Sequence, residues 1–244
     1  MKIIVDIGNT FIKAAIFEGQ NIIWQNKFLP SSFLKDFQKV LENYSQIENL
    51  LYSSSGQPDA ETVNYFHKNF KVLKFDHKSP LPFKNLYETP ETLGLDRIAL
   101  VAAAHKLYQK QNVLVIDAGT CITYDVITKH ESYIGGNISP GIKMRLKALH
   151  DYTAKLPRLE LEEPRTSPLG RNTKDAILNG VIQGVVFEID KNIELYISDY
   201  KDLTVILTGG DQHYLSTQLK NSIFADSNFQ LLGLNALFEF LLND

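Results

Sequence analysis

The sequence is poor in cysteine: its 244 residues include only one, Cys121. A single thiol excludes an internal disulfide and a metal site built from several cysteines. The residues around Cys121 are mostly apolar, which predicts a buried structural thiol, and no histidine or asparagine lies close enough in the sequence to activate it as a nucleophile.

An excess of either charge is also missing. The 25 Lys and Arg residues face 28 Asp and Glu residues, the net charge is −3, and no block of basic residues stands out. This balance gives no attraction to nucleic acid or to an anionic membrane, so we expect neither partner.

No stretch of the sequence approaches the roughly 18–20 apolar residues that a membrane span needs. The chain opens on a strand-like run without a charged leader and a cleavable apolar region. We therefore expect a cytoplasmic enzyme or binding protein.

The composition, 44% hydrophobic and 22% charged, is that of a globular protein. The length fits one large domain or two domains of about 100–150 residues each. Strand-like runs come in two sets of three, each followed by helical segments: 2–7, 11–18 and 21–29, then 112–118, 121–128 and 132–138. The repeated order predicts a structural duplication, with domains 1–111 and 112–244.

The duplication is marked by a repeated turn, "IIVDIGNTFIKAAIF" and "LVIDAGTCITYDVI", with Asp6 and Asp117 separated by 117 − 6 = 111 residues. Gly8 lets the backbone approach a ligand, and neighbouring N–H and hydroxyl groups can hold phosphate oxygens. A carboxylate beside phosphate requires a bridging cation such as water-rich Mg²⁺. The pattern predicts a nucleotide–metal cleft between two α/β domains. The alternative is two unrelated hairpins that share Asp and Gly because turns favour them.

Six motifs occur along the chain in the order "DIGNTFIK", "GLDR", "DAGT", "GGNISPG", "RNT" and "LTGGD". The repeated turns resemble the superfamily of acetate kinase, sugar kinases, Hsp70 and actin, and the full order resembles the type III pantothenate kinases over nearly the whole chain. The resemblance implies two duplicated ribonuclease H-like (actin-like ATPase) domains, each a mixed sheet flanked by helices.

The resemblance also implies an ATP site in the cleft and two cation sites. Asp6 would serve Mg²⁺ through water, and Asp117 would bind a monovalent cation, K⁺ or NH₄⁺. The residues implied to bind ATP are Asp6, Ile7, Gly8, Asn9, Thr10, Phe11, Ile12, Lys13 and Thr120.

For the second substrate, pantothenate, the resemblance implies that Asp96 is the general base. The implied pantothenate-binding residues are Tyr87, Gly94, Leu95, Asp96, Arg97 and Thr173. The resemblance further implies a homodimer in which the substrate site lies near the subunit interface. Thr173 would reach pantothenate in the neighbouring subunit. Each of four residues also has a structural alternative: Asp96 and Thr173 as helix caps, Arg97 in a surface salt bridge, and Tyr87 packed in a Pro-rich loop.

The implied activity is ATP-dependent phosphorylation of pantothenate to 4'-phosphopantothenate, the first step of coenzyme A biosynthesis. An alternative is a non-catalytic nucleotide-binding regulator, like an accessory transcription factor, on the same fold. A filament-forming actin-like protein is a third possibility, disfavoured by the short chain and by "GLDR", which would then have no purpose. The presence of Asp96 and Arg97 favours the enzyme.

Overall fold

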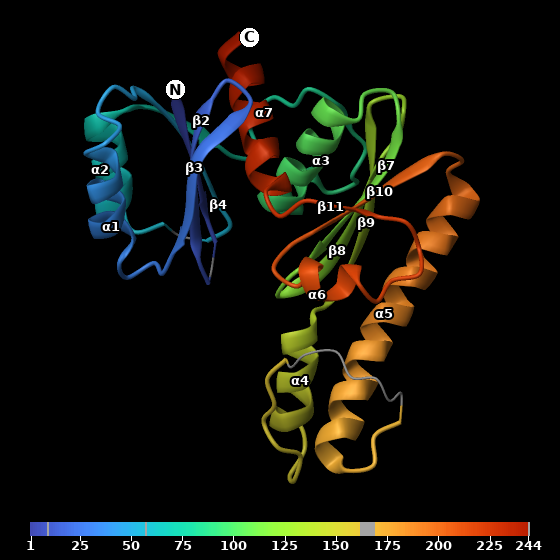
Figure 1. The fold of residues 1–244 in the computed structure, drawn as a ribbon. Helices are drawn as coiled ribbons and strands as arrows, with labels where there is room; N and C mark the ends of the chain where they lie inside the picture. Colours follow the sequence, from blue (N-terminus) through green and yellow to red (C-terminus); the bar gives the residue numbers. More distant parts are fainter. Residues whose placement is uncertain (9, 57, 162–168, 244) are drawn as a thin grey trace. The chain divides into compact units, whose positions relative to one another are not determined.

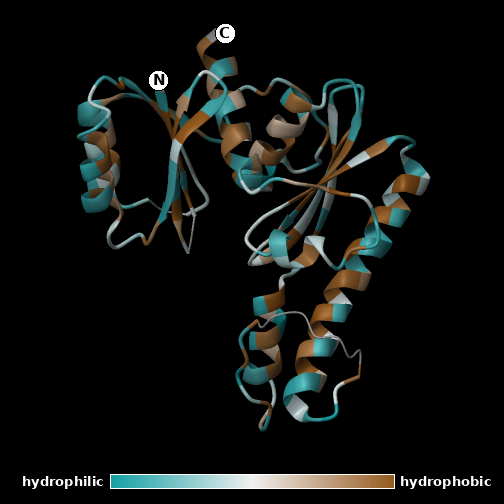
Figure 2. Ribbon diagram, in the orientation of Figure 1, coloured by the Kyte–Doolittle hydropathy of each residue, from teal (hydrophilic) through white to brown (hydrophobic). Residues whose placement is uncertain are grey.

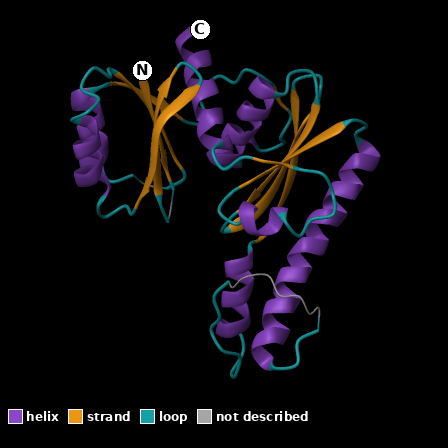
Figure 3. Cartoon of the chain, viewed as in Figure 1, coloured by secondary structure: helices purple, strands orange, loops and turns teal. Residues whose placement is uncertain are grey.

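A computed structural model describes residues 1–8, 10–56, 58–161 and 169–243 of the chain. These residues form two compact units, each with helices packed on a sheet (Figures 1 and 3). Unit 1 comprises Met1–Leu107 together with Asn228–Asp244, and unit 2 comprises Tyr108–Ser227.

Unit 1 is built around a five-stranded mixed sheet with the strand order β3-β2-β1-β4-β5. Strand β1 runs antiparallel to β2 and parallel to β4. The elements of the unit are β1 (Lys2–Ile7), β2 (Ile12–Glu18), β3 (Asn21–Phe28), α1 (Phe33–Leu41), β4 (Asn49–Ser54), α2 (Ala60–Asn69), β5 (Lys71–Phe75), β6 (Lys84–Asn85), a 3₁₀ turn at Pro90–Thr92, α3 (Leu95–Leu107) and α7 (Phe229–Asn243).

The two faces of this sheet are covered by different helices. Alternate residues of β1, among them Ile3 and Val5, pack into an apolar core with Phe33 and Phe37 of α1 and Phe66 of α2. The opposite face of β1 packs against α7. Since Asp6 alternates with the residues of the α1–α2 core, it belongs to the face that α7 covers.

Helix α3 is more buried than its sequence alone predicts. The alanine-rich sequence of 95–107 is typical of a helix with one apolar face, but every residue from 97 to 104 is buried, because α3 packs on both α7 and β4. Hydrophobic residues run along α7 (Figure 2). A Cβ at Gly233 of α7 would lie 1.7 Å from the carbonyl oxygen of Ala99. Glycine at this position therefore permits the close approach of the two helices.

Unit 2 repeats the sheet of unit 1. Within the unit its strands follow the order β11-β10-β7-β8-β9, with β7 antiparallel to β8 and parallel to β10. Its elements are β7 (Asn112–Ala118), β8 (Cys121–Ile127), β9 (Ser132–Pro140), α4 (Ile142–Asp151), α5 (Thr173–Asp199), β10 (Leu203–Thr208), α6 (Gln212–Ser216) and β11 (Phe224–Ala225).

The two repeated carboxylates occupy the same position in the two sheets. Asp6 is the second-last residue of β1 and Asp117 the second-last residue of β7. Each strand has an antiparallel neighbour that follows it in sequence and a parallel neighbour on its other side. The prediction of two duplicated mixed sheets flanked by helices is confirmed.

The compact units do not coincide with the predicted domains 1–111 and 112–244, because the C-terminal helix α7 packs on α3 and β1 of unit 1. Lys2 of β1 and Glu239 of α7 form an ion pair at 2.8 Å that joins the two ends of the chain. The boundary of the duplication itself stays a prediction.

Two further sequence-based expectations concern Cys121 and the absence of apolar runs. Cys121 was predicted to be buried, but it begins β8 at the edge of a turn and is only partly buried. Over the described ranges, no helix combines the length and the apolar character needed to cross a membrane.

Candidate active site

The turn between β1 and β2 spans residues 8–11. The N–H of Gly8 donates to the carbonyl oxygen of Phe11 at 3.1 Å, and a Cβ on Gly8 would lie 2.9 Å from that oxygen. Thr10 and Phe11 are exposed, whereas Asn9 falls outside the described residues. The turn therefore needs glycine at its first position and presents Thr10 and Phe11 to solvent.

Two residues implied to bind ATP, Ile7 and Ile12, flank this turn and have their side chains in the α1–α2 core. Any contact with a nucleotide at these positions would come from the main chain.

Asp6 is 6% exposed and pairs across the strands with Lys13. The Lys13 ammonium donates to Gln230 Oε1 of α7 at 2.6 Å. No sequence signal identified Gln230, which lies 217 residues away along the chain.

The corresponding turn of unit 2 is shorter and packs against a second motif. Here the Gly119 N–H donates to the carbonyl oxygen of Cys121 at 2.9 Å, and Thr120 is exposed. Gly141, the last residue of "GGNISPG", donates its N–H to the Thr120 carbonyl oxygen at 3.1 Å. A Cβ on Gly141 would lie 2.1 Å from the carbonyl oxygen of Gly119, so only glycine fits there.

The "LTGGD" motif approaches the same turn from β10. Gly209 has a φ of +97°, and a Cβ there would lie 2.3 Å from Asp117 Oδ1. The Asp211 N–H donates to the carbonyl oxygen of Ala118 at 2.9 Å. Burial raises the pKa of the Asp211 carboxyl, and nearby Lys143 opposes the rise. Three motifs that are distant in sequence therefore meet at the end of β7.

The "GLDR" motif forms a second cluster, at the start of α3. Asp96 lies in the first turn, where its Oδ1 accepts the N–H of Arg97 at 2.9 Å. A Cβ on Gly94 would lie 2.4 Å from this oxygen, so glycine leaves room for the carboxylate. Arg97 is 4% exposed, and its guanidinium lies 5.5 Å from the ring centroid of Tyr87. Leu95 is buried and anchors the helix start.

The structure decides most of the structural alternatives for these residues. The surface salt bridge is wrong for Arg97, because the side chain is buried. The N-cap is wrong for Asp96, since α3 begins at Leu95 and Asp96 lies inside it. Thr173 is not a cap either, because Asn172 caps α5 by accepting the N–H of Asp175 at 2.9 Å. Tyr87 is partly buried and packs on Arg97.

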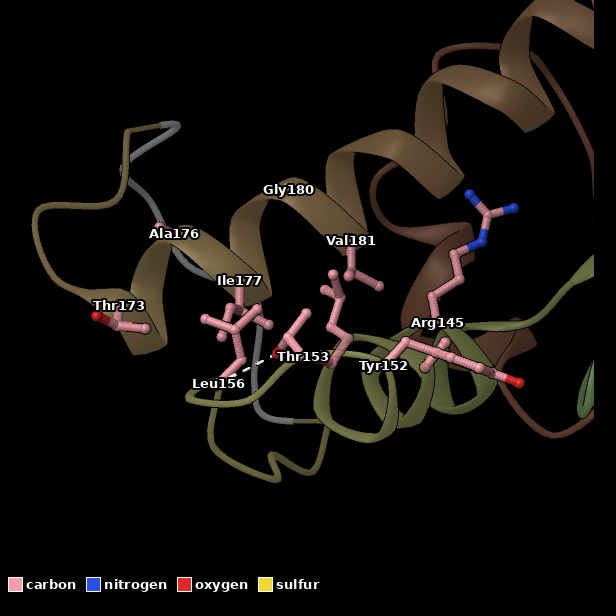
Figure 4. Close-up of a pocket in the computed structure, with 11 residues that line it drawn as sticks. Arg145, Tyr152, Thr153, Leu156, Thr173, Ala176, Ile177, Gly180 and Val181 are labelled. Carbon is pink, nitrogen blue, oxygen red and sulfur yellow. Dashed lines mark hydrogen bonds between the residues drawn. The ribbon is translucent and has the colours of Figure 1, made fainter.

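Thr173 lines a pocket of about 810 Å³ between α4 and α5 of unit 2 (Figure 4). The lining is largely apolar and includes Leu149, Tyr152, Ile177 and Val181. Gly180 and Gly184 lie one turn apart on α5, a spacing that favours the close approach of a neighbouring helix. In the described chain, however, nothing lies within 4 Å of a Cβ built at either glycine. This face of α5 is open in the single chain.

A hydrogen-bonded group at Glu188 of α5, which sequence reasoning missed, connects four elements of unit 2. The Glu188 carboxylate accepts from the hydroxyls of Tyr124 and Ser139 and pairs with Arg145, whose Nε donates to the Pro140 carbonyl oxygen at 2.7 Å. Burial disfavours ionisation of Glu188, but these hydrogen bonds outweigh it and lower the pKa of its carboxyl. The group ties the end of "GGNISP" to α4 and α5.

No cluster of three or more acidic, histidine or cysteine side chains able to hold a metal ion occurs among the described residues. Asp6 in unit 1 and Asp117 in unit 2 are each a single carboxylate near the end of a strand. Neither by itself forms an all-protein cage. The single carboxylate of Asp6 fits Mg²⁺, which commonly keeps several waters and takes other ligands from substrate phosphates.

The two repeated sheets are found in known kinases. A glucokinase from an Antarctic psychrotroph matches 100% of this chain and 99% of its own, with a TM-score of 0.53 and 14% identity. A Campylobacter jejuni protein provisionally assigned to the Baf family of transcriptional activators matches 99% of this chain and 100% of its own, with a TM-score of 0.65 and 23% identity. Both likenesses show the fold alone. It is the actin-like ATPase fold of the sugar-kinase class.

The sequence comparisons then identify the family. The family model for type III pantothenate kinase matches residues 2–195. A type III pantothenate kinase of Christiangramia forsetii is 47% identical over 240 residues, which cover 98% of each chain. This chain belongs to the type III pantothenate kinase family.

Proposed function

We propose that this protein transfers the γ-phosphoryl group of ATP to the terminal hydroxyl of pantothenate and forms 4'-phosphopantothenate, the first step of coenzyme A biosynthesis. The observation that carries the proposal is the cluster of Asp96, Arg97 and Tyr87 in a chain of this family. A helix start with a carboxylate beside a buried guanidinium suits an acceptor with a hydroxyl and a carboxylate.

Asp96 acts in this mechanism as the general base for the attacking hydroxyl. The transition state of phosphoryl transfer is loose, so the protein mainly positions the reactants and balances charge. Arg97 would pair with the pantothenate carboxylate, because a planar guanidinium binds a carboxylate through two parallel hydrogen bonds. Tyr87 supports the guanidinium through its ring, and Gly94 and Leu95 hold the start of α3.

The repeated turns are the proposed phosphate-binding elements. The turn at Gly8 to Phe11 and the hydroxyls of Thr10 and Thr120 would bind phosphate oxygens, and the Lys13 ammonium would add a positive charge. Asp6 would hold Mg²⁺ through water, and Mg²⁺ would neutralise phosphate charge when bound. Asp117 would bind a monovalent cation, K⁺ or NH₄⁺.

The test of the activity is a direct product assay. Purified protein with ATP, Mg²⁺ and K⁺ should convert pantothenate to phosphopantothenate, detected by mass, and a panel of other alcohols should react far more slowly. Replacing K⁺ with Na⁺ at equal ionic strength should depress the rate if Asp117 holds a selective site. ATP binding without turnover at every K⁺ concentration would instead favour the non-catalytic regulator, which no observation on this chain currently supports.

We also propose a homodimer that uses the open face of α5. Phe187 is 61% exposed and follows Gly180 and Gly184 at helical spacing, so the three residues share one face. Met144 of α4 and Tyr152, which follows the last residue of α4, add exposed apolar surface. In this dimer Thr173 would reach the pantothenate site of the partner subunit. The enzyme would work in the cytoplasm, where its substrates occur.

Replacing Phe187 with aspartate should weaken the dimer about 100-fold or more, since a charge would be buried at the interface. Analytical ultracentrifugation at micromolar protein should then show the mass of one chain for this variant and of two chains for the wild type. Phe224→Asp is the matched control, because Phe224 is a 63% exposed phenylalanine on β11. A wild-type protein that sediments as one chain would contradict the dimer.

A further inference from the structure

A polar contact lies on the α7-covered face of the unit 1 sheet, next to the first turn. Gln230, the second residue of α7, is 7% exposed and accepts the Lys13 ammonium at 2.6 Å. Lys13 in turn lies across the strand pair from the buried Asp6. Elsewhere on this face of β1 and β2 the buried residues are apolar, as Ile4, Ala15 and Phe17 are. Polar contacts therefore lie at the two ends of this face, with apolar residues between them: the Lys13–Gln230 pair next to the turn and the Lys2–Glu239 ion pair at the opposite end.

The residue that accepts the hydrogen bond of Lys13 affects both the position and the net charge of the ammonium group. A free lysine carries about 2 kcal/mol of side-chain rotamer entropy, which is lost when the ammonium is held in place. Gln230 accepts a hydrogen bond from the ammonium at 2.6 Å, and its neutral amide adds no negative charge next to Lys13. A glutamate at the same position would hold Lys13 equally well and would neutralise it.

We propose that Gln230 is a positioning residue for ATP. It holds the Lys13 ammonium next to the first turn without adding a negative charge that would oppose binding of the phosphate groups. The inference rests on the proposed function, in which Lys13 contributes to phosphate binding. It assigns a part of the nucleotide site to the last helix of the chain, which carries none of the six motifs.

Two substitutions separate this role from a purely structural one. Gln230→Leu removes the acceptor, and Gln230→Glu keeps its shape and strengthens the bond but cancels the charge. Both variants should raise the KM for ATP and the Kd for ATP with Mg²⁺ by about tenfold, the scale of one hydrogen bond to a charged group. The KM for pantothenate should not change. A structural role predicts the opposite for Gln230→Glu, namely wild-type ATP affinity and an unchanged or higher Tm.

The matched control is Asn235→Asp on the same helix. Asn235 is also a buried amide, and it donates to the Gly19 carbonyl oxygen at 3.4 Å, at the opposite end of β2. This variant is expected to lower the Tm without changing the KM for ATP. An equal rise of that KM in the control and in Gln230→Glu would overturn the proposal.

A Lys13→Met variant distinguishes failure of this inference from failure of the proposed function. We expect Lys13→Met to raise the KM for ATP, and Gln230→Leu to add nothing further in the double variant. If Lys13→Met has wild-type ATP affinity, Lys13 has no part in ATP binding, and both the proposed role and this inference are wrong. If Lys13→Met binds ATP weakly while both Gln230 variants bind it normally, only the inference is wrong.

Discussion

Replacing Asp96 with asparagine lowers the kcat for pantothenate phosphorylation by about 10²–10⁴-fold, the usual contribution of a general base. Asparagine retains the size of the side chain and an oxygen that can accept the Arg97 N–H, so the start of α3 is expected to persist. The KM for ATP should change little, because the predicted ATP-binding residues are elsewhere in the sequence. Steady-state kinetics with both substrates varied measures the effect.

The control for Asp96→Asn is Asp36→Asn, which removes a first-turn carboxylate from helix α1 of the same unit. Loss of such a carboxylate costs about 0.3–1 kcal/mol of helix stability through the helix dipole. The control should therefore shift the Tm slightly and leave kcat unchanged. A kcat for Asp96→Asn within about threefold of the wild type would remove Asp96 from the role of base.

Replacing Gly141 with alanine is expected to distort the second turn. The new Cβ would meet the backbone carbonyl oxygens of Gly119 and Thr120, at 2.1 and 2.7 Å, and backbone cannot move aside cheaply. Overpacking of this kind costs about 1–3 kcal/mol of the free energy of unfolding. Because Thr120 moves with the turn, ATP binding should weaken as well. Urea unfolding and calorimetric ATP titration measure the two effects.

Gly119→Ala is the matched comparison for Gly141→Ala. A Cβ on Gly119 would have only ordinary contacts, with Asp117 and Cys121 oxygens at 4.0 Å. Its free energy of unfolding should stay near the wild-type value, although Gly119 belongs to the more conspicuous motif. Equal destabilisation by both substitutions would show that the contact between "GGNISPG" and the turn is not what requires glycine at Gly141.

The strands and the duplication were predictable because their signals are local. The bounds of strands β1 and β7 match the bounds of two apolar runs in the sequence. A turn that contains glycine follows each strand. The repeated Asp-x-Gly predicts equivalent positions for Asp6 and Asp117 in two sheets, and the structure has them at the second-last residues of β1 and β7. The start of α5 also has a local signal, because asparagine is a favoured N-cap residue and the Asn172 side chain accepts the N–H of Asp175.

Burial of α3 was less predictable, because the environment of a helix depends on what packs around it. The apolar residues of its sequence predict one buried face, but contacts with α7 and β4 bury Arg97 as well. This burial changes the interpretation of Arg97 from a surface charge to a desolvated guanidinium beside Tyr87. Similarly, Cys121 has apolar neighbours in sequence but lies at the edge of a turn and is only partly buried.

By itself the sequence determined the repeated sheet, the two carboxylate-bearing turns and the "GLDR" helix start, because apolar periodicity and turn chemistry act over a few residues. Tertiary structure alone decided which distant groups meet: α7 with the first sheet, Gln230 with Lys13, and Gly141 and Gly209 with the turn after β7. These contacts join residues up to 237 positions apart, and no local period encodes them. They depend on how whole elements pack within each unit, and they involve the turns that we propose to bind ATP.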